Sequence, residues 1–70
     1  MKYDVVQNAN GNITVISSWD DNKNGAFQAF HHQCELLYSD EQTTKATVKV
    51  LDENLDVVDG KIEYINKVQA

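Results

Sequence analysis

Residues 26–38 read AFQAFHHQCELLY, and the fold predicted from this sequence depends on that stretch. Apolar side chains recur in it at spacings of three and four residues, the pattern of an amphipathic helix with one buried face. That face carries Phe27, Phe30, Cys34 and Leu37. Because one helix cannot bury such a face alone, the sequence requires a second layer.

The helix is expected to begin between Asp20 and Asn22 and to end near Ser39. Several side chains at its start can accept hydrogen bonds from the first free N–H groups of a helix, namely Ser18, Asp20, Asp21 and Asn22. Gly25 is a weak helix former, because a glycine inside a helix is less favourable than an alanine by ~1 kcal/mol. The pattern leaves open whether the helix begins at Gly25 or is interrupted there.

Two strands are expected before the helix. Residues 3–7 and 13–17 alternate in the period of a strand, and Asn10-Gly11 between them favours a type I′ hairpin turn. This alternation predicts one shared sheet face for Tyr3, Val5, Ile13 and Val15.

Two further strands are expected after the helix, in TTKATVKVL (43–51) and VVDGKIEYI (57–65). The first should bury Ala46, Val48 and Val50, whereas Asp59-Gly60 in the second suggests a bulge. In the second, Ile62 and Tyr64 should point away from Lys61 and Glu63. The predicted outer face of the sheet consists of Asp4, Val6, Thr14, Ile16, Lys45, Thr47, Lys49, Lys61, Glu63 and Ile65.

This order of elements predicts an α+β fold. We expect a two-layer ββαββ sandwich, in which a four-stranded antiparallel sheet carries one helix packed on one face. Residues 1–70 should form a single domain with one modest core.

Charge and cysteine content limit the partners and the cellular location that we expect for this protein. Eleven acidic residues against six lysines, with no arginine, give a net charge of −5. Nucleic acid is therefore not an expected partner, because phosphates attract clustered basic residues and bases are most often read by arginine. Cys34 is the single cysteine and cannot form an internal disulfide, which favours a cytoplasmic location. The apolar runs are too short for a membrane span.

The cluster FHHQCELLY (30–38) raises the question of a metal or thiol site. His31, Cys34 and Glu35 have helical spacing, but His32 points in a different direction and a closed zinc site needs about four ligands. Cys34 lies on the apolar face, where a thiol is not activated as a nucleophile. We therefore predict no catalytic residue, no metal and no cofactor; only a dimer that brings two such helices together could complete a metal site.

The segment DENLDVVDGKIE (52–63) resembles a calcium-binding EF-hand loop at four positions, Asp52, Asn54, Asp56 and Glu63. The match fails at Val57, where that loop needs glycine, and the flanking residues have strand periodicity. An acidic hairpin turn explains the same residues.

Two exposed surfaces are candidates for contact with other molecules. Ala29, His32 and Leu36 form a small apolar strip on the helix, facing away from the core. The acidic turn carries Asp52, Glu53, Asp56 and Asp59, which could meet a basic partner. The free edges of the sheet are a third route to association. We expect a homodimer, with another protein as a second candidate partner and with no nucleic-acid or membrane partner.

The run from AFHHQCELLY through TTKATVKVLDEN to IEYI resembles small proteins of phages and prophages of Gram-positive bacteria, which share a "V.VLDE.L.VV" pattern and a closing "EYI". The resemblance implies the fold and a phage context, and no activity. The leading hypothesis is a non-enzymatic protein-interaction module that acts as a homodimer. The alternative is an acidic inhibitor that mimics nucleic acid and occupies a basic host protein.

Overall fold

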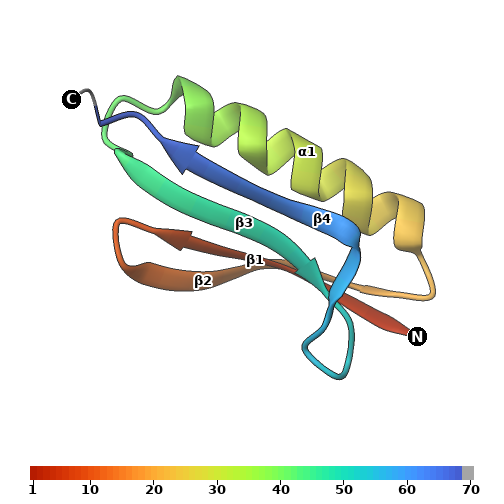
Figure 1. Cartoon of the computed structure of the whole chain (residues 1–70). Coiled ribbons are helices and arrows are strands. Elements are labelled where there is room, and N and C mark those ends of the chain that lie inside the picture. Colours follow the sequence, from red (N-terminus) through yellow and green to blue (C-terminus); the bar gives the residue numbers. More distant parts are fainter. Residues whose placement is uncertain (69–70) are drawn as a thin grey trace.

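The structure, a computed structural model, describes residues 1–68 and has two layers, a sheet and one helix lying across it (Figure 1). The elements follow one another as β1 (Lys2–Ala9), β2 (Asn12–Asp20), α1 (Lys23–Ser39), β3 (Lys45–Leu51) and β4 (Val57–Asn66). The predicted ββαββ sandwich is therefore confirmed.

The sheet has the strand order β2-β1-β3-β4, and each neighbouring pair is antiparallel. The chain forms the β1–β2 hairpin, crosses the sheet as α1, and returns in β3 beside β1. Consequently β1 and β3 are central, whereas β2 and β4 are the edges.

The core lies between α1 and the two central strands. Val5, Val48 and Val50 are completely buried on the sheet side, and Ala26, Phe30 and Leu37 face them from the helix. These helix residues are spaced by three and four, so they form one stripe over the sheet.

The turns and the helix start follow local chemistry. Asn10 and Gly11 both have positive φ angles, 51° and 89°, as a type I′ turn requires. Asn22 caps α1, because its side chain accepts a hydrogen bond from the Gly25 N–H at 2.9 Å. Gly25 therefore lies inside the first turn of the helix.

The predicted facing of β2 is wrong in its first half. The register shifts between Val5 and Val6, so that Val5 pairs with Ser17 whereas Val6 pairs with Val15. The extra residue, Ile16, forms a bulge that reverses the alternation relative to β1. Ile13 and Val15 consequently lie on the outer face and not with Tyr3 and Val5 in the core.

Because of the bulge, Thr14 and Ile16 are also not on the outer face, where the sequence alternation had placed them. Thr14 pairs with Gln7, whose side chain accepts a hydrogen bond from Gln33 of α1, so Thr14 lies on the helix side of the sheet. Ile16 is half-buried and packs against the core.

The predicted facing of β4 is also wrong. Ile65 pairs with Ala46 and is 2% exposed, so it belongs to the core face, and Lys61 and Glu63 share that face. Ile62 and Tyr64 lie outside. The reason is that β4 is an edge strand at the margin of α1, where inward-facing charged side chains reach polar groups of the helix instead of the core: Glu63 accepts a hydrogen bond from the Tyr38 hydroxyl at 2.6 Å.

Candidate interaction surfaces

The outer face of the sheet carries no covering element within residues 1–68. Two rows of side chains cross it, set by the strand register. The first row runs Val15–Val6–Lys49–Ile62 and the second runs Ile13–Asn8–Thr47–Tyr64. We call these eight residues the outer-face rows.

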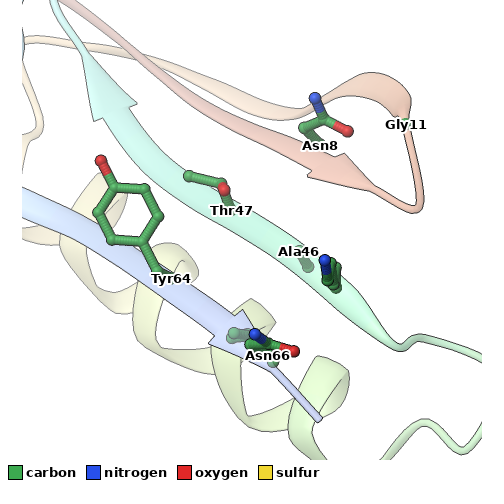
Figure 2. Close-up of a pocket in the computed structure, with 8 residues that line it drawn as sticks. Asn8, Gly11, Ala46, Thr47, Tyr64 and Asn66 are labelled. Carbon is green, nitrogen blue, oxygen red and sulfur yellow. The ribbon is translucent and has the colours of Figure 1, made fainter. Parts of the chain in front are cut away.

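The outer-face rows expose large apolar side chains to solvent. Ile13, Val15 and Tyr64 are 74%, 58% and 73% exposed. Figure 2 shows Asn8, Thr47 and Tyr64 projecting from one face of the sheet, with α1 behind it. Ile13 and Val15 lie beside Val6 at one edge of the sheet, and Tyr64 lies beside Ile62 at the other edge, with Asn8, Thr47 and Lys49 between the two groups. Exposed apolar residues that stand singly need no explanation, but apolar groups that gather on one uncovered sheet face are typical of an interaction site.

Two shallow depressions lie on this face. One, of about 270 Å³, lies among the rows between Val6, Ile13, Lys49 and Ile62. The other, of about 420 Å³, lies near the β1–β2 turn and is lined by Asn8, Lys45, Thr47, Tyr64 and Asn66, among others (Figure 2). The surface therefore offers shape and hydrogen-bonding groups as well as apolar area.

The charges on this face differ from those of the whole chain, whose net charge is −5. Lys49 stands inside the first row, between Val6 and Ile62. Asp4, at the end of the face, accepts a hydrogen bond from the Ser18 hydroxyl at 2.6 Å. The middle of an acidic protein's sheet thus carries a positive group among apolar ones.

The cluster FHHQCELLY divides between two environments. Cys34 is buried, at 8% exposed, and burial raises the pKa of its thiol, with the Glu63 carboxylate raising it further. A thiol with a raised pKa is a poor nucleophile near neutral pH. Both histidines are exposed: the His31 Nε2 atom lies 3.5 Å from Lys61 Nζ and its ring is edge-on to Phe30.

Potential metal ligands do not converge in the part of the chain that the structure describes, where no three His, Cys, Asp or Glu side chains are placed to hold one ion. Asp52, the first residue of the EF-hand-like segment, is bonded to backbone instead. Its carboxylate accepts from the Asn54 and Asp56 N–H groups at 2.8 and 3.0 Å and thereby closes the β3–β4 turn.

The helix strip of Ala29, His32 and Leu36 is only partly exposed for contact with a partner. His32 and Leu36 are exposed, Leu36 to 49%, but Ala29 is half-buried and packs against the core. A depression of about 540 Å³ lies beside it, bounded by Trp19, Gly25, Gln28 and His32, among others.

The acidic residues of the β3–β4 hairpin are similarly divided. Asp59 forms an ion pair with Lys23 at 2.5 Å, and Asp52 is committed to the turn. Glu53 and Asp56 are exposed. Two of the four predicted contact carboxylates therefore have roles within the chain.

Comparison of the chain with protein-family models, with curated proteins and with solved structures gave no match. The resemblance to phage proteins stays a prediction. No helix in residues 1–68 is long and apolar enough to cross a membrane.

Sequence reasoning missed Ile13, Val15, Ile62 and Tyr64 as surface residues, because simple alternation assigned them to the core. The local pattern of β4 favours the wrong face, because the side with Ile62 and Tyr64 is more apolar than the side with Lys61, Glu63 and Ile65. Only the pairing of Ile65 with the buried Ala46 identifies the face that meets the core.

Proposed function

We propose that this protein is a non-enzymatic interaction module that binds another protein through the outer-face rows. The observation that carries the proposal is the exposure of Ile13, Val15 and Tyr64 on one uncovered sheet face. Burying such side chains removes apolar surface from water, at ~25 cal/mol per Å², which is the main favourable contribution to protein association.

The size of the molecule sets an upper limit on this interface. The Cα atoms span 40 × 19 × 18 Å, so a rectangle of roughly 760 Å² bounds one broad face, and a partner must cover most of that face to reach the ~800 Å² of a standard interface. The chain has no need of this face for its own core, which lies on the opposite side of the sheet under α1.

Charge defines the chemistry of the partner. Lys49 lies among apolar neighbours, so a partner that covers the rows must either leave its ammonium group in water or pair it with an acid. We infer a partner whose apolar surface carries a carboxylate that meets Lys49. A basic partner fits the acidic β3–β4 turn better, but two carboxylates of that turn are already bonded within the chain.

The test is site-specific photo-crosslinking in the cell that produces the protein. A photoreactive residue at Thr47, in the middle of the outer face, should give one defined protein adduct. The same residue at Gln28, exposed on the far side of α1, is the matched control and should not give that adduct. Absence of a Thr47 adduct with another protein would overturn the proposal.

Two variants locate the interaction further. Val15→Lys and Lys49→Glu should each abolish the Thr47 adduct, the first by placing a charge in the apolar row and the second by repelling the partner's carboxylate. Glu53→Lys, in the acidic turn, should leave it intact. If Glu53→Lys removes the adduct and Val15→Lys does not, the acidic turn is the binding surface and the nucleic-acid-mimic alternative replaces this proposal.

A further inference from the structure

The edge strand β4 has a free side. It pairs with β3 along Lys45–Leu51, and nothing in residues 1–68 pairs with its other side. Such an edge presents unpaired N–H and C=O groups that can add another strand. The other edge, β2, is interrupted in its middle by the bulge at Ile16, whereas the irregularity of β4 lies before Lys61 and leaves residues 61–66 extended.

The charge order of β4 is complementary to itself. The segment reads Lys61-Ile62-Glu63, with the two charged side chains on the helix side of the sheet and Ile62 on the outer face. If two copies pair antiparallel about a two-fold axis at Ile62, Lys61 of each copy lies opposite Glu63 of the other. Two opposite-charge pairs then form on one face, and Ile62 meets Ile62 on the other.

Neighbouring registers lack this match. An axis at Lys61 places the two Lys61 side chains opposite each other, and an axis at Glu63 does the same with two glutamates. Like charges directly opposite across a strand pair are destabilising. The edge of β2 carries no charged residue between Asn12 and Trp19, so nothing comparable selects a register there.

The match lies in the regular part of the strand. Asp59 and Gly60 have positive φ angles of 50° and 68° and form the bulge expected there, so the extended edge of β4 begins at Lys61. On the helix side, a groove of about 380 Å³ beside β4, lined by His31, Tyr38 and Glu63 among others, leaves room for the side chains of an added strand.

From this complementarity we propose that a second copy of the chain binds at the β4 edge, antiparallel about Ile62, and joins the two four-stranded sheets into one continuous sheet. The first outer-face row then runs through Ile62 into the same row of the second copy. This association uses the strand edge, does not depend on the partner proposed for the outer face, and can be tested without it.

The test is a charge swap followed by sedimentation velocity. The wild-type chain should be a dimer. Lys61→Glu places a glutamate opposite Glu63 of the second copy, and Glu63→Lys places a lysine opposite Lys61, so each variant should raise the dimer Kd about tenfold or more. An equimolar mixture of the two variants should form heterodimers, because each glutamate of one variant then lies opposite a lysine of the other. Native mass spectrometry with one variant isotopically labelled identifies the heterodimer.

Matched controls carry the same charge changes away from the edge. Lys45→Glu lies on the central strand β3, and Glu41→Lys lies in the exposed α1–β3 connection; neither should change the Kd. Because Lys61 and Glu63 also contact α1, circular dichroism must show that each variant is folded.

Hydrogen exchange on the wild-type chain tests the edge without any variant. Raising the concentration should slow exchange of amides in β4 and not in β2. A monomeric wild-type chain, concentration-dependent protection of β2 instead of β4, or folded single variants that dimerise as the wild type does would each overturn the proposal.

Discussion

Gly25 is fixed by packing and not by backbone conformation. A Cβ atom at this position would lie 2.7 Å from two ring carbons of Trp19 and 2.6 Å from the Asn22 side-chain nitrogen. Trp19 comes from the end of β2 and is held by a 2.8 Å hydrogen bond from its ring N–H to the Ser17 hydroxyl. The glycine therefore lets the end of the sheet approach the first turn of the helix.

Gly25→Ala should consequently destabilise the protein, although alanine is the better helix former by ~1 kcal/mol. We expect a loss of about 1–3 kcal/mol in the free energy of unfolding, the usual cost of overpacking. Urea unfolding followed by Trp19 fluorescence measures it. Asn24→Ala, at the exposed neighbouring position, is the control and should be neutral or stabilising. Equal stability of the two variants would show that the Trp19 side chain moves away from the added methyl group without a loss of stability.

At the scale of the element, the bulge in β2 determines which side chains face the helix. Ile16 is the extra residue, so the alternation on its two sides is opposite in phase relative to β1. Trp19 and Ser17 face inward after the bulge, whereas Val15 and Ile13 face outward before it. One residue thus converts two core-like side chains into exposed ones.

Two lysine substitutions test this assignment. Val5→Lys should unfold the chain, because Val5 is fully buried and an unpaired charge there has no partner. Val15→Lys should change the free energy of unfolding by less than about 0.5 kcal/mol, as surface substitutions do. Thermal unfolding by circular dichroism distinguishes them. Comparable destabilisation by both would mean that β2 runs without the bulge and that Val15 is in the core.

At the scale of the whole molecule, one end of the sandwich is tied together by polar contacts among segments far apart in sequence. The Asn10 side chain, in the β1–β2 turn, accepts from the Thr44 N–H at 3.1 Å and donates to the Gln42 carbonyl at 3.1 Å. Lys67, just after β4, donates to the carbonyls of Leu37 and Asp40 at the end of α1. These bonds hold the helix layer to the sheet layer where the core ends.

Asp40 makes this end of the molecule sensitive to acid. The pKa of its carboxyl lies below the usual value, because the Gln42 N–H and then the Thr43 hydroxyl donate to the carboxylate, with Lys67 nearby. The folded chain therefore holds this proton less tightly than the unfolded chain. The stabilisation is fully present above the unfolded pKa of ~3.9 and is lost as pH falls through the lower folded value.

Asp40→Asn should therefore lower Tm at neutral pH, and the Tm difference from wild type should shrink as pH falls below ~4, where the wild-type carboxyl is itself protonated. Thermal scans between neutral and acidic pH measure this difference. Glu41→Gln removes a neighbouring exposed charge and should show no such trend. A Tm gap between wild type and the Asp40→Asn variant that stays constant with pH would rule out the carboxylate as its source.

The sequence by itself determined the elements and their layering. The helix periodicity of residues 26–38, the Asn10-Gly11 turn and the alternation of Ala46, Val48 and Val50 are local patterns that the structure satisfies. The one difference is that the buried helix face includes Ala26, whereas Phe27 is only half-buried. Local patterns suffice there because each residue's environment is set by neighbours within one or two turns of backbone.

Tertiary structure alone decided which surface is free. The facing of β2 depends on the bulge at Ile16 in its pairing with β1, and the facing of β4 depends on how far the helix reaches across the sheet. Both are set by contacts between different elements. For that reason the sequence pointed to the helix cluster FHHQCELLY as a candidate site, whereas the outer-face rows with Ile13, Val15 and Tyr64 follow only from the pairing of the strands.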